Sequence, residues 1–81
     1  MRLVTLYGKP GCCLCDDARE VVLSVRQSTP FALEEVDVSL DSALHRQYGE
    51  RIPVVAVDGE ELFEYHVDPD ALADSVSRVE T

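Results

Sequence analysis

The period of apolar and polar positions changes along the chain, and each change marks the boundary of a predicted element. Residues 3–7 form a short apolar run of strand-favouring residues, and the Gly and Pro residues of 8–11 end it. This predicts a strand followed by a turn. From Leu14 to Val25 the apolar residues recur at helical spacing, with charged residues between them, which predicts an amphipathic helix that ends before Pro30.

The middle of the chain predicts an acidic strand and a second, shorter helix. Residues 31–38 are strand-prone but carry Glu and Asp, which suits the edge of a sheet. Ser39 or Asp41 is expected to cap the helix, and Gly49 is expected to end it in the left-handed conformation. The apolar positions of this helix are Leu40, Ala43, Leu44 and Tyr48.

The last third of the chain predicts a hairpin and a final helix. Residues 53–57 are apolar, Asp58-Gly59 is typical of a tight hairpin turn, and residues 60–65 form the return strand. Asp68 is a suitable N-cap, and Pro69 suits the first position of a helix. The apolar stripe of this helix consists of Leu72, Val76 and Val79.

These elements predict an α/β protein with the order strand, helix, strand, helix, strand, strand, helix. The chain of 81 residues is long enough for one small domain, over residues 1–81. A right-handed crossover gives a parallel strand pair and the hairpin an antiparallel one, so we expect a mixed four-stranded sheet flanked by three helices. The uncharged runs 3–7 and 53–57 suit its two central strands.

The charge of the chain narrows the range of partners. Sixteen acidic residues against seven basic ones give a net charge of −9. Binding to nucleic acid gains its affinity from Lys and Arg, so a nucleic-acid partner is not expected. The sequence contains neither a secretory signal nor the ~18 consecutive apolar residues of a membrane span, which favours a cytoplasmic protein without a membrane partner. Nothing in the sequence demands more than a monomer.

All three cysteines lie in the segment Cys12-Cys13-Leu14-Cys15, where the predicted turn meets the first predicted helix. Such a cluster closes no long loop, so it indicates local thiol chemistry rather than a disulfide scaffold. Free backbone N–H groups at a helix start stabilise an anionic sulfur, and a three-residue spacing places Cys12 and Cys15 on one face. We therefore expect Cys12 to attack a disulfide, Cys15 to resolve the mixed disulfide, and Cys13 to have no role.

Charged residues flank this segment on both sides. Lys9 can add positive potential or hold an anionic group of a substrate. Asp16 and Asp17 oppose an anionic sulfur by like-charge repulsion, although both are more typical of helix starts than of acid–base catalysts.

Two other uses of the cysteines are weighed against this one. A zinc site would need His45 and His66, which lie in different predicted elements, so it is disfavoured. A small soluble carrier could bind a thiophilic metal through Cys12 and Cys15. Heavy-metal-associated domains, however, have the order strand, helix, strand, strand, helix, strand, which differs from the one predicted here. A third alternative is a redox-inactive interaction domain.

Over essentially its whole length the sequence resembles the thioredoxin fold, and most closely the short bacterial glutaredoxin-like proteins. The resemblance rests on Lys9-Pro10-Gly11-Cys12-Cys13-Leu14-Cys15, on Ile52-Pro53 before the third strand, on the Asp58-Gly59 hairpin and on the final helix. It implies that Pro53 is cis and faces the reactive cysteine. It also implies that the backbone of Ile52 pairs with a bound thiol peptide.

The sequence departs from glutaredoxins where they bind glutathione. Glutaredoxins usually carry Cys-Pro-Tyr-Cys, Thr-Val-Pro and Gly-Gly-x-Asp, whereas this chain has Cys12–Cys15, Arg51-Ile52-Pro53 and the stretch Phe63–Asp68. Without the glycines, Phe63 and Glu64 are expected to crowd or repel a glutathione carboxylate, although Lys9 and Arg51 can hold its other end. We therefore expect a thiol–disulfide oxidoreductase without a resident cofactor. Its substrate would be a disulfide-containing protein or a small thiol, with weak glutathione binding.

Overall fold

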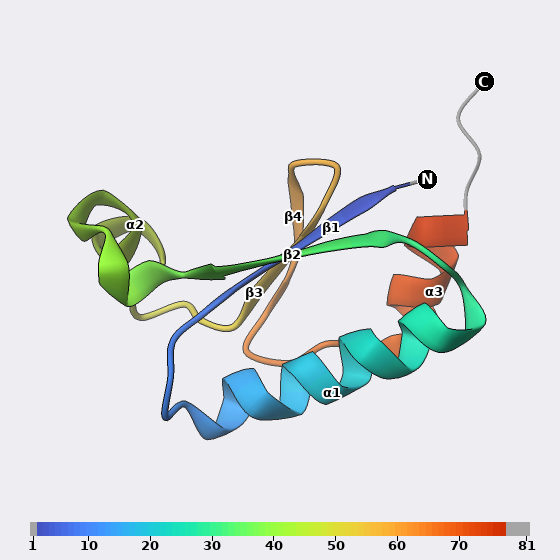
Figure 1. Ribbon diagram of the computed structural model, residues 1–81, viewed down its shortest axis with the longest axis horizontal. Coiled ribbons are helices and arrows are strands. Elements are labelled where there is room, and N and C mark those ends of the chain that lie inside the picture. The colour runs from blue at the N-terminus through green and yellow to red at the C-terminus, as the bar shows by residue number, and fades with distance from the viewer. Residues whose placement is uncertain (1, 78–81) are drawn as a thin grey trace.

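The structure, a computed structural model, describes residues 2–77 of the chain, and these form a single sheet with helices packed against it (Figure 1). The elements are β1 (Leu3–Gly8), α1 (Cys13–Ser28), β2 (Ala32–Asp37), the short 3-10 helix η1 (Val38–Leu40), α2 (Ser42–Tyr48), β3 (Val54–Val57), β4 (Glu60–Glu64) and α3 (Pro69–Ser77).

The sheet has four strands in the order β2-β1-β3-β4. β1 pairs with β2 in parallel, whereas β1 with β3 and β3 with β4 are antiparallel. The mixed sheet, its three α-helices and its α/β class were all predicted from the sequence and are confirmed. The uncharged strands β1 and β3 are central and the acidic strands β2 and β4 are the edges, as predicted.

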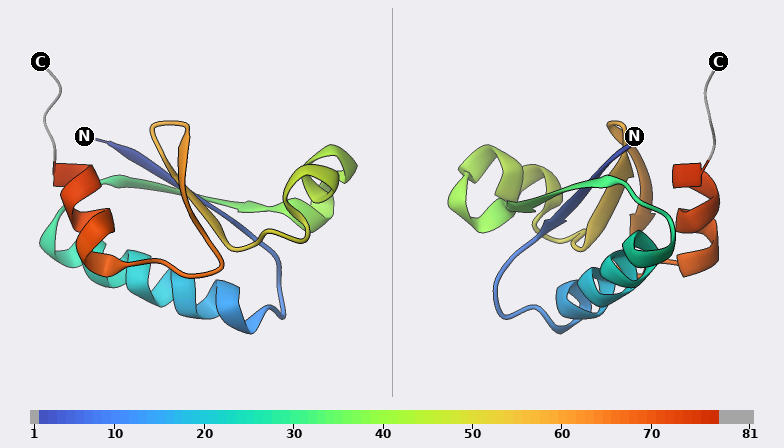
Figure 2. Two further views of the ribbon diagram at one scale, coloured as in Figure 1. Left: turned by 180° about the vertical axis from the view of Figure 1, so that it is seen from behind. Right: turned by 45° about the vertical axis from the view of Figure 1, so that its right-hand side comes forward.

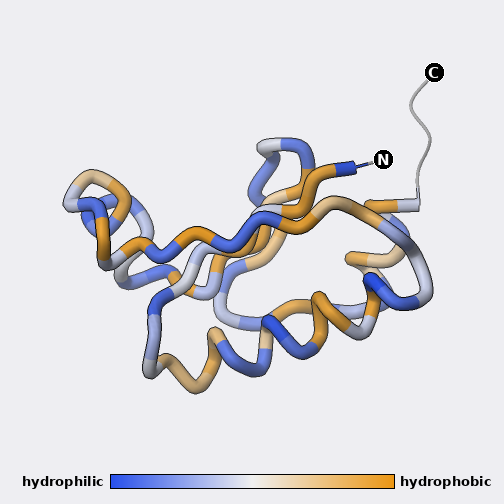
Figure 3. Tube along the Cα trace, viewed as in Figure 1, coloured by the Kyte–Doolittle hydropathy of each residue, from blue (hydrophilic) through white to orange (hydrophobic). Residues whose placement is uncertain are grey.

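Helices α1 and α3 lie side by side against one face of the sheet, and α2 lies at the opposite end from α3 (Figure 2). Along α1, apolar positions alternate with polar ones, so one side of the helix can be buried (Figure 3). The main core lies between this side and the sheet. Its buried residues are Val4, Leu6, Ala18, Val22, Val25, Phe31, Val55, Val57, Leu72 and Val76.

The hairpin between β3 and β4 has the predicted turn. Asp58 and Gly59 both have positive φ, 52° and 87°, the backbone conformation for which Asp-Gly is preferred. The Asp58 carboxylate also accepts a hydrogen bond of 2.9 Å from the N–H of Leu3 and pairs with Arg2. The backbone donor of Leu3 and then the Arg2 side chain hold the pKa of Asp58 below its usual value, so the turn is tied to the first strand.

Of the two candidate caps, Asp41 caps α2, as one of the two alternatives predicted, whereas Ser39 belongs to η1. Two details differ from the sequence prediction. Leu40 is 84% exposed because it lies in η1, outside the apolar side of α2. Gly49 has a φ of −55°, so the expected left-handed helix end is wrong. The position instead excludes a side chain because a Cβ there would collide with the carbonyl oxygen of His45.

The last helix begins as predicted, since the Asp68 carboxylate accepts hydrogen bonds from the N–H groups of Asp70 and Ala71. Leu72 and Val76 are buried, whereas Val79, the third residue of the predicted stripe, lies outside the described residues. Among residues 2–77, no helix has the length and apolar character that crossing a membrane requires.

Candidate functional site

Cys12 lies at the N-cap of α1, directly after the loop that leaves β1. Its backbone is extended, and its Sγ accepts a hydrogen bond of 3.3 Å from the N–H of Cys15. The sulfur thus occupies the place of the side-chain oxygen in an ordinary helix cap, where it satisfies a backbone donor that the helix itself cannot pair. Cys12 is half-buried, so it is more exposed than Cys15.

Cys15 is one turn further along α1 and only 7% exposed. It packs in a second apolar cluster with Val38, Tyr48, Ile52 and Val54, against which Cys12 also lies. Burial and then the hydrogen bond with Cys12 raise the pKa of the Cys15 thiol from 9.0 to about 11, although a backbone hydrogen bond from Lys9 acts in the opposite direction.

Gly8 makes this burial sterically feasible. A Cβ on Gly8 would lie 3.1 Å from the Sγ of Cys15 and 3.3 Å from its Cβ, closer than side-chain carbons normally approach. The last residue of β1 therefore leaves room for the Cys15 side chain. Cys13, by contrast, is exposed, and all three cysteines are free thiols.

The segment before β3 supplies the opposite wall of the site. Ile52 is 7% exposed and shares the apolar cluster of Cys15, and the peptide bond between Ile52 and Pro53 is cis. The structure therefore brings together Cys12, Cys15 and the Ile52-Pro53 pair, which the sequence places about forty positions apart.

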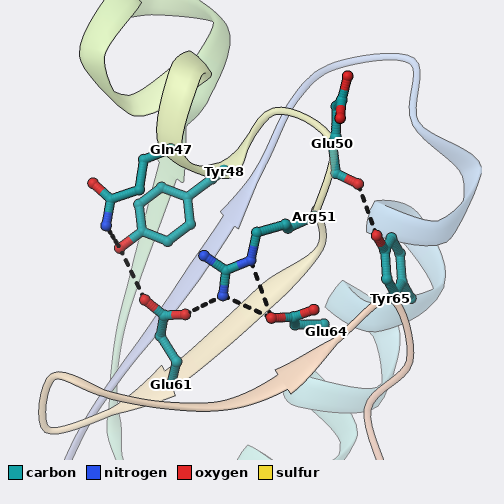
Figure 4. Close-up of polar contacts among 7 residues, drawn as sticks. All are labelled: Gln47, Tyr48, Glu50, Arg51, Glu61, Glu64 and Tyr65. Carbon is teal, nitrogen blue, oxygen red and sulfur yellow. Dashed lines mark hydrogen bonds and ion pairs between the residues drawn. The ribbon is translucent and has the colours of Figure 1, made fainter.

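Tyr65 fixes this segment and was missed by sequence reasoning. Its N–H donates to the carbonyl of Pro53 at 2.8 Å, and its hydroxyl donates to the carbonyl of Glu50 at 2.9 Å. Tyr65 has a φ of 66°, which is unfavourable for a bulky residue and has no sequence signature. The two hydrogen bonds hold both ends of residues 50–53 against the chain that follows β4. Figure 4 shows the one to Glu50.

Arg51 is engaged by two carboxylates within the protein. Its guanidinium donates to Glu61 and, at 2.7 and 3.0 Å, to Glu64, both on β4 (Figure 4). These hydrogen bonds, with Glu64 foremost, raise the pKa of Arg51 further. The expectation that Arg51 holds a glutathione carboxylate stays a prediction, and two carboxylates of the chain already accept hydrogen bonds from its Nε and Nη2 atoms.

An aromatic pair, Tyr7 and Tyr48, packs against the guanidinium of Arg51. The ring of Tyr48 stacks on that of Tyr7 with a centroid distance of 4.3 Å, and the Arg51 guanidinium carbon lies 5.6 Å from the centre of the Tyr48 ring. The Tyr48 hydroxyl also donates to Glu61. Burial and the neighbouring Tyr7 raise the pKa of Tyr48, so this hydroxyl stays neutral.

Phe63 and Glu64 were expected to crowd or repel a glutathione carboxylate, but the two side chains lie in different surroundings. Phe63 packs against the main core and Glu64 turns toward Arg51, so it is Tyr65 that lies along the Ile52-Pro53 segment. The absence of the glycine cradle stays relevant, because Glu64 adds a negative charge at this edge of the site.

On the other side of Cys15 lies a cavity of about 350 Å³, between the start of α1 and the ends of β1 and β2. Lys9 is exposed at its wall, and no carboxylate of residues 2–77 pairs with it. The described part of the chain places no three His, Cys, Asp or Glu side chains so that they could hold a metal ion, and His45 and His66 do not complete a zinc site with the cysteines.

Comparison with known proteins assigns the family. Residues 3–77 match the glutaredoxin-like domain family (DUF836), which accounts for nearly the whole chain. The chain belongs to this glutaredoxin-like family. A glutaredoxin-like protein of Dictyostelium discoideum is 30% identical over 77 residues, covering 85% of this chain and 69% of the relative. A protein of Mycobacterium tuberculosis is 28% identical over 80 residues, covering 93% of this chain and 82% of the relative.

Solved structures show that this glutaredoxin-like chain has the thioredoxin-like fold. Protein Ne2328 from Nitrosomonas europaea matches with a TM-score of 0.80 and 28% identity, over 94% of this chain and 92% of the other. Protein XcR50 from X. campestris matches with a TM-score of 0.75 and 34% identity, over 89% and 92%. A thioredoxin mutant from Halobacterium salinarum matches with a TM-score of 0.69 and 27% identity, over 99% and 78%.

Proposed function

We propose that this glutaredoxin-like protein is a thiol–disulfide oxidoreductase that works through Cys12 and Cys15. The Cys12 thiolate attacks one sulfur of a substrate disulfide and the other leaves as a thiol, so that a mixed disulfide forms. Cys15 then attacks the Cys12 sulfur, the Cys12–Cys15 disulfide forms, and the second substrate thiol is released. The substrate disulfide is reduced by two electrons and the protein dithiol is oxidised.

The observation that carries the proposal is the unequal placement of the two thiols. Cys12 is half-buried at the N-cap with a backbone N–H aimed at its sulfur, whereas Cys15 is buried one turn away. Because the pKa of Cys15 is raised to about 11, this thiol stays protonated while Cys12 meets the substrate. The order of attack and resolution follows from that difference.

The residues around Cys12 and Cys15 indicate the class of substrate that we propose. The backbone of Ile52 is proposed to pair with an extended thiol peptide, and Lys9 offers a cation. Arg51 is held by Glu61 and Glu64, which supports weak binding of glutathione and favours a disulfide-containing protein or another small thiol as substrate. The proposed location is the cytoplasm, where free thiols persist.

The other candidate functions have less support. A metal carrier of the heavy-metal-associated type needs a different element order, since here α2 lies between β2 and β3. A redox-inactive interaction domain needs no accessible nucleophile, whereas Cys12 is only half-buried.

The test is disulfide exchange measured with an aryl disulfide, dithiobis(nitrobenzoate), which releases a coloured thiolate. In the Cys13→Ser background, Cys12→Ser should reduce the fast release to the uncatalysed background, and Cys13→Ser alone should retain it. Exchange that survives Cys12→Ser would contradict the proposed mechanism. Slow exchange in the parent protein, at the rate of the same chain unfolded in urea, would favour the redox-inactive domain.

A further inference from the structure

The mechanism leaves one proton without an acceptor. Cys15 must lose its proton to attack the mixed disulfide, yet it is 7% exposed and its pKa is raised to about 11. Near neutral pH the thiolate fraction of such a group is below about one in a thousand. Within the apolar cluster on one side of Cys15, the titratable residues besides Cys12 are Tyr7 and Tyr48, and burial keeps Tyr48 neutral by raising its pKa.

The cavity on the other side of Cys15 provides the exit for this proton. At about 350 Å³ it is large enough for several water molecules, and its wall is in part charged. The residues that line it are Leu6, Gly8, Lys9, Pro10, Cys15, Asp16, Arg19, Glu35, Val36 and Asp37.

Two of the three carboxylates in this wall are already engaged. The Asp37 carboxylate accepts hydrogen bonds from the N–H and the hydroxyl of Ser39, at 2.9 and 2.5 Å, and thereby caps η1. The Glu35 carboxylate pairs with Arg19 at 2.7 Å. Asp16 is exposed at the first turn of α1, and within residues 2–77 its side chain makes no hydrogen bond or ion pair.

We propose that Asp16 accepts the proton of Cys15, through a water molecule in this cavity, in the step that resolves the mixed disulfide. This inference rests on the proposed dithiol mechanism. The Cys15 S–H proton passes to the Asp16 carboxylate, the Cys15 thiolate attacks the Cys12 sulfur, and the substrate sulfur leaves with the electron pair. The Asp16 carboxyl then returns the proton to the leaving thiolate or to solvent, so protons and electrons balance.

The remaining charges around Cys15 suit this step. A backbone hydrogen bond from Lys9 stabilises the Cys15 thiolate, and the Lys9 ammonium lies in the same wall, where it can screen the transient anion. Arg19 is held by Glu35, so it does not neutralise Asp16. Asp16 is thus the carboxylate in the wall that no hydrogen bond or ion pair within residues 2–77 engages.

If Asp16 acted only through its negative charge, its removal would change the rate of resolution in the opposite direction. As a fixed negative charge, Asp16 helps to raise the pKa of Cys15 and so disfavours its thiolate. Removing that charge would then speed resolution. Removing a proton acceptor slows it, typically by about 100-fold or more.

The experiment separates attack from resolution in a single reaction. In the Cys13→Ser protein, dithiobis(nitrobenzoate) releases one coloured thiolate when Cys12 attacks and a second when Cys15 resolves the adduct. Near neutral pH, Asp16→Asn should slow the second phase by about 100-fold and leave the first within about twofold. The second phase of this variant should then rise steadily with pH, because hydroxide replaces the carboxylate.

Two variants serve as controls. Asp17→Asn removes the same charge from the neighbouring exposed position, which does not line the cavity, and should leave both phases unchanged. Asp16→Glu should restore most of the second phase because it keeps a carboxylate.

An unchanged or faster second phase in Asp16→Asn overturns the role of Asp16. If the first phase persists after Cys12→Ser, the proposed function itself has failed. The two failures are therefore distinguishable.

Discussion

The backbone N–H of Cys15 donates a hydrogen bond to the sulfur of Cys12, with 3.3 Å between the nitrogen and Sγ. This contact makes Cys12 the cap of α1, whereas packing against the apolar cluster of Val38, Tyr48, Ile52 and Val54 buries Cys15 one turn behind it. The same turn of helix therefore supplies both a half-buried thiol and a buried one, and the difference between them can be measured.

The first prediction concerns the titration of Cys15. Because burial is the largest cause of its raised pKa, we expect the thiol to keep most of this shift in a Cys12→Ser, Cys13→Ser variant, although the hydrogen bond with Cys12 is lost. Its alkylation by iodoacetamide should still be rising above pH 9.0, the ordinary value. The same variant unfolded in urea should level off near that value, and a matching plateau in the folded protein would contradict the burial of this thiol.

The raised pKa of Cys15 also determines how the free energy of unfolding changes with pH. The folded state keeps the Cys15 proton to higher pH than the unfolded chain does, so this group lowers the free energy of unfolding as pH rises from 9.0 to about 11. Cys15→Ala should flatten this part of the profile of unfolding free energy against pH. An identical slope in both proteins would show that Cys15 titrates alike when folded and unfolded.

Gly8→Ala should disturb the packing around Cys15 directly. The added Cβ would lie 3.1 Å from the Sγ of Cys15, so we expect a loss of about 1–3 kcal/mol in unfolding free energy and a changed alkylation rate at Cys15. Gly11→Ala is the matched control. Its φ of 79° makes that change unfavourable too, but nothing lies within 4 Å of the added Cβ, so the reactivity of Cys15 should not move. Equal effects on that reactivity would refute a specific role for Gly8.

Releasing Arg51 should improve glutathione binding. In a Glu61→Gln, Glu64→Gln double variant the guanidinium loses both carboxylates and can bind one from the ligand. We expect KM for a glutathione mixed disulfide to fall about 5-fold, equivalent to about 1 kcal/mol. Glu60→Gln, at a position that does not contact Arg51, should leave KM unchanged. An unchanged KM in the double variant would mean that Arg51 does not limit glutathione binding.

Tyr65→Phe should loosen the segment that carries Ile52 and Pro53. The change removes the hydrogen bond to the Glu50 carbonyl but keeps the ring, so we expect a loss of about 0.5–1.5 kcal/mol in the free energy of unfolding by urea. An unchanged free energy of unfolding would show that the hydrogen bond from Tyr65 to the Glu50 carbonyl contributes no net stability, which would contradict this prediction.

The parts of the fold that the sequence predicted correctly are those with local causes. The helical spacing from Leu14 to Val25 alone predicts α1, the Asp58-Gly59 pair alone predicts the hairpin, and Asp68 alone predicts the start of α3. The Cys12–Cys15 spacing likewise needs only the geometry of one helical turn.

The parts that could not be predicted depend on contacts between distant segments. Whether Arg51 is free depends on two glutamates of β4, which reach it only after the hairpin has formed. Leu40 fits the apolar pattern of a helix, yet η1 leaves it exposed. The roles of Tyr65 and of the cavity beside Cys15 likewise follow from where β4 and β2 end, which no local pattern encodes.

The most direct measurement is the intact mass of the Cys15→Ser, Cys13→Ser protein after reaction with a disulfide substrate. Without a resolving thiol, the mixed disulfide should persist, adding the mass of one substrate thiol at Cys12 that a reductant removes. The further change Cys12→Ser should abolish the adduct. An adduct that never accumulates, or one that forms equally well without Cys12, would contradict a dithiol mechanism initiated by Cys12.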